Sequence, residues 1–144
     1  MKNLSTLVED IYKTVSDLNN GNKQIPDEML ESLSKGISGA VKAWASPKEN
    51  KEFILRISNV GRPARQLYYN KKYTSNYSPD APTLIKFLYG HLLEELLLFL
   101  VKLSGHTVTS EQKEITVNSV KGHMDCKIDG EVIDIKTASG FAFK

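Results

Sequence analysis

Residues 122–136 read GHMDCKIDGEVIDIK and decide how the second half of the chain folds. Asp129-Gly130 favours a two-residue turn of type I′, the tight turn that joins antiparallel strands. Such a turn sets the register of the two strands that it connects. The expected facing pairs are Ile128 with Glu131, Cys126 with Ile133, and Asp125 with Asp134.

Strand alternation then sorts these residues onto two faces. Asp125, Asp134 and Lys136 fall on one face. The other face is predicted to pack on the core and consists of Met124, Cys126, Ile128, Ile133 and Ile135.

The facing aspartates need an explanation. Two carboxylates about 5 Å apart repel by roughly 3 kcal/mol at an effective dielectric constant near 20. A sheet keeps such a pair if one carboxylate is protonated or if a cation lies between them, and hard divalent ions such as Mg²⁺ bind clusters of oxygen ligands. The alternative, a solvated strand face on which Lys136 neutralises the two aspartates, stays open at this point.

Lys136 indicates what a metal site here would do. Its ammonium group lies on the strand face of Asp134 and can reach whatever the metal holds. The metal would polarise a phosphate and acidify a water molecule, and the lysine would orient that water or offset developing charge. The combination is suited to the hydrolysis of phosphodiester bonds.

The strongest helix pattern covers roughly residues 83–103, is closed by Gly105, and offers a third carboxylate. Glu94 lies one turn after Gly90 on the same helix face, and the missing side chain of Gly90 leaves room for a metal, water or substrate. Glu95, one turn after His91, is the competing choice. We favour Glu94, because a carboxylate among leucines is costly to bury unless it is paired or coordinating.

Other segments complete an α+β fold class: a helical N-terminal half, and a long buried helix packed on a mainly antiparallel β-meander. Helices are expected over 4–18 and from Pro26 onward, and Ser58 is expected to cap a short helix around 62–70. Residues 52–57 are compatible with a strand or a helix. Three strands, ITVNS, HMDCKI and EVIDIKT, are expected to be separated by VKG and DG. We divide the chain into a helical region, 1–50, and a core, 51–144.

Composition excludes several classes of protein. The formal net charge is only +2, so an anionic partner must be recognised by local clusters. Cys126 is the single cysteine, which excludes an internal disulfide and a four-cysteine metal or iron–sulfur site. Acidic residues near the start are not typical of a signal peptide, and the apolar run 96–101 is too short for a membrane span. We therefore expect a cytoplasmic protein with no membrane contact.

Residues 51–73 form a basic segment interspersed with tyrosines. Arginines beside a helix N-terminus near Ser58 would hold phosphates, and tyrosines can stack on unpaired bases. Alternatively, Leu67 and Tyr68 pack inward while the cations are merely solvated. The residues predicted to contact DNA are Arg56, Ser58, Arg62, Arg65, Tyr68, Lys71 and Lys72.

The combined motifs resemble the PD-(D/E)XK nuclease superfamily, most closely its RecB-type and phage-exonuclease branches. The family pattern is a helical glycine-x-x-x-glutamate, a glycine-x-x-aspartate strand, and an acidic-x-lysine strand that continues into threonine. The matching residues are Gly90 and Glu94, Gly122 and Asp125, and Asp134, Lys136 and Thr137. The likeness covers roughly residues 55–139.

The resemblance implies a restriction-endonuclease-like core and a role for each site residue. Asp125 and Asp134 would ligate Mg²⁺ or Mn²⁺ with the Ile135 carbonyl, Glu94 would support the site, and Lys136 would activate the water. Met124 stands where the superfamily has its naming proline. The family core continues with a further helix and strand, so the core is apparently truncated here, and a longer chain, a partner or a second copy would complete it.

The expected function is that of a metal-dependent DNA exonuclease in phage recombination or DNA degradation. DNA and exonuclease action come from the resemblance alone. No iron–sulfur cluster is expected, because Pro63-Ala64-Arg65 lacks the cysteine that some relatives carry there. The alternatives are a structure- or site-specific endonuclease with the same site, and a non-catalytic DNA-binding module with a vestigial site.

Overall fold

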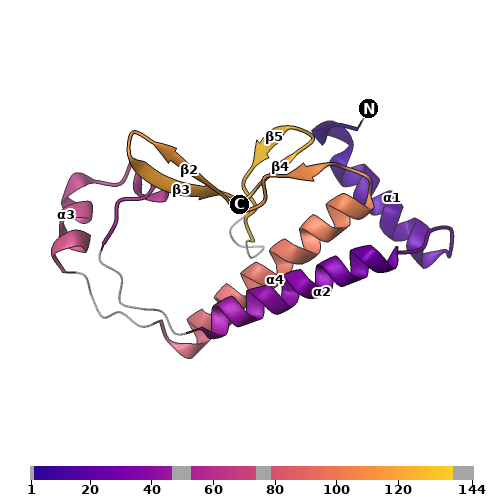
Figure 1. The fold of residues 1–144 in the computed structure, drawn as a ribbon, viewed down its shortest axis with the longest axis horizontal. Helices are drawn as coiled ribbons and strands as arrows, with labels where there is room; N and C mark the ends of the chain where they lie inside the picture. Colours follow the sequence, from indigo (N-terminus) through magenta and orange to yellow (C-terminus); the bar gives the residue numbers. More distant parts are fainter. Residues whose placement is uncertain (1, 47–52, 74–78, 138–144) are drawn as a thin grey trace, which may run out of the picture.

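The structure is a computed structural model that describes residues 2–46, 53–73 and 79–137 (Figure 1). It combines helices with antiparallel strands, so the predicted α+β class is confirmed. In chain order the elements are η1 (Leu4–Thr6), α1 (Leu7–Asn19), α2 (Asp27–Ala45), η2 (Ile57–Asn59), α3 (Ala64–Lys72), α4 (Ala81–Leu103), β1 (Val108–Thr109), β2 (Lys113–Val117), β3 (Val120–Met124), β4 (Cys126–Ile128) and β5 (Glu131–Ile133).

Helices α2 and α4 lie side by side and antiparallel (Figure 1). One hydrogen bond holds α4 near its N-terminus and another holds it at its C-terminus. The Trp44 indole donates to the carbonyl of Leu84 at 2.8 Å, and Lys23 donates to the carbonyl of Leu103 at 2.7 Å. The helical expectations over 4–18 and from Pro26 are confirmed.

Capping residues set both ends of helix α4. The Asp80 side chain accepts a hydrogen bond from the backbone of Thr83 at 3.1 Å and caps the N-terminus. At the other end Gly105 has a φ of 87°, and the N–H groups of Gly105 and His106 bond back to the last turn. This is a Schellman-type end, for which glycine is suited.

The β4–β5 hairpin has the predicted register. Cys126 faces Ile133 and Ile128 faces Glu131. Asp129 and Gly130 have φ values of 51° and 92°, as a type I′ turn requires. β1 adds to the other edge of β4, which gives a three-stranded sheet of order β1-β4-β5.

The rest of the expected meander is wrong in three places. EVIDIKT is not a strand throughout, because β5 ends at Ile133, so the expected pair of Asp125 with Asp134 lies beyond the paired residues. HMDCKI is not one strand, because it breaks at Asp125 into β3, which belongs to the sheet with β2, and β4, which belongs to the sheet with β1 and β5. The turn between β2 and β3 is formed by Asn118 and Ser119, both at positive φ, whereas VKG lies inside β3. Gly122 is needed there for another reason: an added Cβ would lie 2.8 Å from the Cβ of Ile57.

The core sits where the three-stranded sheet covers the C-terminal end of α4. Its buried side chains are Leu98, Val101, Cys126 and Ile128. Apolar residues of η1, α1 and β1 pack around them, as do Ile133 and Ile135. The predicted core face of the hairpin is therefore confirmed for Cys126, Ile128, Ile133 and Ile135, whereas Met124 lies in β3, faces Lys113 and is not part of this core.

The expectation of a long buried helix is wrong for most of α4. Buried α4 residues are confined to its last turns, whereas Ile85, Tyr89, Leu93 and Leu96 are exposed. These side chains stay exposed because the small three-stranded sheet packs only on the C-terminal end of α4, and α2 packs on only one side of the helix. Within the described residues, no helix has the length and apolar character that crossing a membrane requires.

The segment before α3 is neither the strand nor the helix expected for 52–57. Its described part makes one isolated bridge, between Arg56 and Lys121, and then the short turn η2. Ser58 lies inside η2 and does not cap α3, which begins at Ala64 after Pro63. The predicted helix N-terminus near Ser58 is therefore wrong, because proline at position 63 sets the helix start instead.

Candidate active site

Asp134 and Lys136 follow β5 at the open end of the β4–β5 hairpin. Lys136 Nζ lies 2.6 Å from Asp134 Oδ2, and both side chains are largely exposed, at 77% and 66%. The hydrogen bond with Asp134 raises the pKa of Lys136, and the charge of Asp125 adds to that rise. Both predicted aspartates, Asp125 and Asp134, therefore lie within electrostatic reach of Lys136.

Asp125 occupies the break between β3 and β4 and is half-buried. Its Oδ2 accepts a hydrogen bond from the backbone N–H of Ile135 at 2.7 Å, and its carbonyl accepts one from Gln112 at 2.8 Å. The backbone of Asp125 makes no strand pairing with the described residues after β5. The Asp125 side chain instead makes the hydrogen bond to that part of the chain. Asp125 is thus held in place rather than free to rotate.

Glu94 reaches the same region from α4. Partial burial raises the pKa of Glu94, a hydrogen bond from Gln112 opposes that rise, and the negative charge of Asp125 adds to it. The Gln112 amide lies 2.6 Å from Glu94 Oε1. Gln112 therefore links helix α4 to Asp125, a role that no local sequence signal indicates, because it depends on a loop with positive φ.

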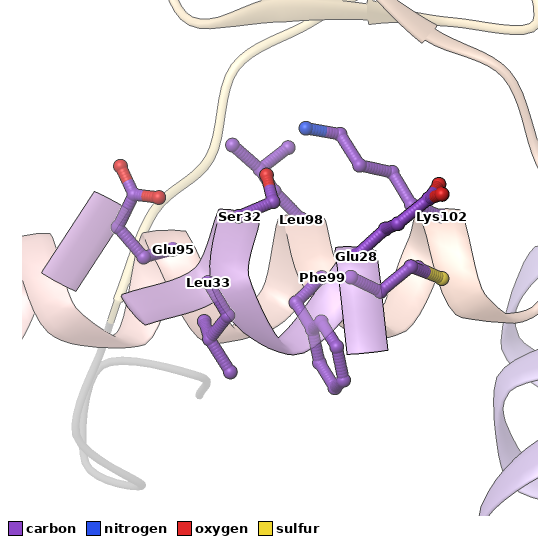
Figure 2. A pocket seen from close by; sticks show the side chains of 8 residues that line it. Glu28, Ser32, Leu33, Glu95, Leu98, Phe99 and Lys102 are labelled. Carbon is purple, nitrogen blue, oxygen red and sulfur yellow. The ribbon is translucent and has the colours of Figure 1, made fainter. Parts of the chain in front are cut away.

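Glu95 lies on the other side of α4. Its carboxylate lies against Gly36 of α2, and it lines a cavity of about 250 Å³ between α2 and α4 (Figure 2). The other residues around this cavity are Glu28, Met29, Ser32, Leu33, Leu98, Phe99 and Lys102. Of the two candidates, only Glu94 is on the side of the hairpin.

A second cavity, of about 240 Å³, adjoins Glu94. Its lining residues are Lys86, Phe87, Gly90, His91, Glu94, Ile135 and Thr137. A Cβ on Gly90 would lie 3.7 Å from Thr137 Oγ1, an ordinary van der Waals contact, so Gly90 borders the chain after β5 without being required for its approach. Gly90, Glu94 and Thr137, which the family pattern groups together, line one hollow.

The donor chemistry of this region fits a hard divalent cation, since carboxylate and carbonyl oxygens are its preferred ligands. One oxygen of Asp125 is used by the Ile135 N–H, and the Asp134 carboxylate is paired with Lys136. In the part of the chain that the structure describes, no three His, Cys, Asp or Glu side chains gather closely enough to hold a metal. As arranged, two carboxylates at most would share one ion, with the Ile135 carbonyl and water completing its shell.

The seven residues predicted to contact DNA are all exposed. No residue of α3 is buried, and Tyr68 is 57% exposed, so the alternative in which Tyr68 packs inward is wrong. Leu67 alone of this helix is partly covered. The structure places the basic segment beyond the β2–β3 hairpin, away from the three-stranded sheet (Figure 1).

A second polar cluster was not predicted. The buried His106 lies with Nδ1 2.6 Å from Asp129 and Nε2 3.1 Å from Asp10. Asp129 also accepts from the Thr107 N–H at 3.0 Å, and Lys2 lies 3.1 Å from Asp10. This cluster ties the N-terminal helix to the turn of the β4–β5 hairpin; a histidine directly after the helix-ending glycine was its only local signal.

No protein-family model, curated protein or solved structure matches this chain. The resemblance to PD-(D/E)XK nucleases therefore stays a prediction. Its support is the set of quoted motifs together with the arrangement of the side chains that carry them.

Proposed function

We propose that this protein is a metal-dependent DNA nuclease of the PD-(D/E)XK type, acting as an exonuclease in DNA degradation or phage recombination in the cytoplasm. The observation that supports it best is a convergence. Asp125, between β3 and β4, lies within electrostatic reach both of Glu94 of α4 and of Lys136 after β5, and Lys136 is paired with Asp134. Three separate parts of the chain supply these groups, as a built site requires.

Each residue has a defined role in this proposal. Asp125 and Asp134, with the Ile135 carbonyl, hold Mg²⁺ or Mn²⁺, and Glu94 supports them from the helix. The bound ion supplies Lewis-acid activation of the scissile phosphate. Lys136 orients the attacking water and offsets negative charge as the phosphodiester bond breaks.

Two surfaces are available for the substrate. The cavity beside Gly90 admits a phosphate next to Glu94, and Lys86 on its wall adds a positive charge. The exposed cations of the basic segment, Arg56, Arg62, Arg65, Lys71 and Lys72, grip the DNA backbone farther away. In this proposal the site belongs to a restriction-endonuclease-like core.

One observation favours a second candidate, a non-catalytic nucleic-acid-binding module. Lys136 already neutralises Asp134, and Asp125 already has an internal donor in the Ile135 N–H. These pairings relieve the repulsion between the aspartates without an ion. Such a module would keep the hairpin for stability alone and bind through the basic segment.

The test is degradation of linear DNA, with covalently closed circular DNA beside it, in Mg²⁺ or in EDTA. We expect Mg²⁺-dependent loss of the linear DNA, survival of the circles, and no activity in Asp134→Asn. Glu131→Gln is the matched control, an exposed acid on the same hairpin that should leave activity unchanged. Cleaved circles would indicate the endonuclease. Binding to DNA without any cleavage, unaffected by Mg²⁺ and by Asp134→Asn, would favour the binding module.

A further inference from the structure

Helix α3 carries a group of tyrosines that the fold does not use. Tyr68, Tyr69 and Tyr73 are 57%, 44% and 61% exposed, and no residue of α3 is buried. Aromatic side chains normally contribute to folding by burying large areas, so three that remain in solvent on one short helix need another explanation. Their rings contact one another: Tyr69 and Tyr73 are stacked with centroids 5.8 Å apart, and Tyr68 meets Tyr69 edge to face at 5.6 Å.

Cations are held against the same rings. Arg65 lies 5.7 Å from the ring centre of Tyr69, and Lys72 lies 5.8 Å and 5.5 Å from those of Tyr68 and Tyr73. Residues 53–73 carry five arginines and lysines and no acidic residue, while the whole chain has a net charge of only +2. The rest of the chain therefore has a net charge of −3. Positive charge is concentrated around the exposed tyrosines.

We infer that α3 binds a single-stranded polynucleotide, with unpaired bases stacked on Tyr68, Tyr69 and Tyr73 and the adjoining phosphates paired with Arg65 and Lys72. A base stacks on the face of an aromatic ring, where Arg65 and Lys72 now lie. The incoming base therefore takes the place of the cation on the ring, and the cation turns to the phosphate beside that base. A duplex offers cations its phosphates but keeps its base faces covered. An acidic peptide would satisfy the charges but not the rings.

The inference deepens the proposed function, on which its biological meaning rests, because it names the form of the substrate. The N-terminal side of α3 is joined through η2 to β3, where Ile57 packs on Gly122, three residues before Asp125. In Figure 1 the β2–β3 hairpin lies between α3 and the three-stranded sheet. A single strand held on α3 is thus directed along this hairpin toward the candidate site.

The binding test uses the whole protein in EDTA, so that no strand is cut and the metal site plays no part. Fluorescence anisotropy compares a labelled 20-nucleotide dT strand, the equivalent rU strand, and a 20-base-pair duplex. We expect tighter binding of a single strand than of the duplex. The triple change Tyr68→Leu, Tyr69→Leu, Tyr73→Leu should weaken single-strand binding about tenfold or more, since loss of one stacked base has effects of that order. Duplex binding should change far less.

Two controls keep this test falsifiable. The corresponding triple change to Phe keeps the rings and should bind a single strand as the unchanged protein does. The double change Tyr12→Leu, Tyr89→Leu removes tyrosines that are 69% and 61% exposed elsewhere and should also leave binding unchanged. Circular dichroism checks that the helices persist in each variant. Tyrosine dependence with dT or with rU supports the inference and identifies the polynucleotide.

Three outcomes overturn the inference: equal binding of single strand and duplex, a Leu variant that binds like the unchanged protein, or displacement of the strand by poly-glutamate at matched charge. None of these bears on metal-dependent cleavage. Conversely, an inactive protein that still binds single strands through α3 would reject only the nuclease proposal.

Discussion

The two ends of the β4–β5 hairpin use acidic residues in opposite ways. At the turn, Asp129 pairs with a histidine whose side chain is 0% exposed and with a backbone N–H. At the open end, Asp134 is 66% exposed and pairs with the exposed Lys136. The turn end is closed by contacts within the protein, and the open end adjoins a cavity.

This difference separates stability from function on one short element. The His106 cluster buries the imidazole ring with a partner at each ring nitrogen, and it connects α1 to the hairpin turn. Near the open end the charge of Glu94 is not fully compensated, because partial burial raises the pKa of Glu94 despite the hydrogen bond from Gln112, and the negative charge of Asp125 adds to that rise. Charge held at such a cost is typical of a ligand site.

The largest expected effect is on catalysis at the open end. Lys136→Ala should lower Mg²⁺-dependent hydrolysis of linear DNA about 100-fold or more, because it removes the group that orients the water. The free energy of unfolding should change by less than about 0.5 kcal/mol, as for other exposed positions. Nuclease assays and urea unfolding measure the two effects. Lys113→Ala, an exposed lysine on β2, is the matched control. Full activity in Lys136→Ala would contradict the proposed catalytic role of the open end of the hairpin.

The turn end should show the reverse. His106→Ala should lower the free energy of unfolding by about 3 kcal/mol, because it leaves two carboxylates near a buried site without their shared partner. Urea unfolding measures the loss, and activity per folded molecule should persist. His123→Ala changes an exposed histidine and should have little effect. A His106→Ala protein as stable as the unchanged protein would show that the His106 cluster does not stabilise the turn end of the hairpin.

Low pH should reduce the contribution of Asp129 to the stability of the turn end. The hydrogen bond with His106, followed by the Thr107 N–H, lowers the pKa of Asp129 from its ordinary value of 3.8. A lowered pKa stabilises the fold above the ordinary value, and that contribution disappears as the pH falls through the folded-state pKa. Asp129→Asn should therefore be less stable than the unchanged protein at pH 7. The gap, measured by urea unfolding from pH 7 to pH 2, should shrink in acid; a constant gap would contradict this origin.

The smallest expected effect is a gain in stability at the open end. Burial raises the pKa of Glu94 above its ordinary value of 4.5, so its charge opposes folding at neutral pH. Glu94→Gln keeps an acceptor for Gln112 and should raise the free energy of unfolding in EDTA by less than about 1 kcal/mol. The gain should vanish below pH 4.5, where the carboxyl group is protonated in both states. Exposed Glu9→Gln is the control, and a loss of stability in Glu94→Gln would contradict the sign.

Local chemistry made the hairpin and the helices predictable. Asp129-Gly130 sets the β4–β5 register by itself, and alternation from that register assigns the core face of these two strands correctly. Asp80 and Gly105 similarly limit α4, because capping acts within one turn of the chain. The same reasoning failed at Val120-Lys121-Gly122, where Gly122 serves a contact with Ile57 instead of a turn.

Sequence therefore determined the turn and the register of the paired residues. The face predicted for Asp125, Asp134 and Lys136 is not a strand face, because β4 begins at Cys126 and β5 ends at Ile133. Only the tertiary structure decided that Glu94 rather than Glu95 lies toward the hairpin, that the strand breaks at Asp125, and that His106 joins Asp10, 96 residues away, to Asp129. The physical reason is range: turn and capping preferences act over a few residues, whereas these contacts exist only after α1, α4 and the sheet have packed together.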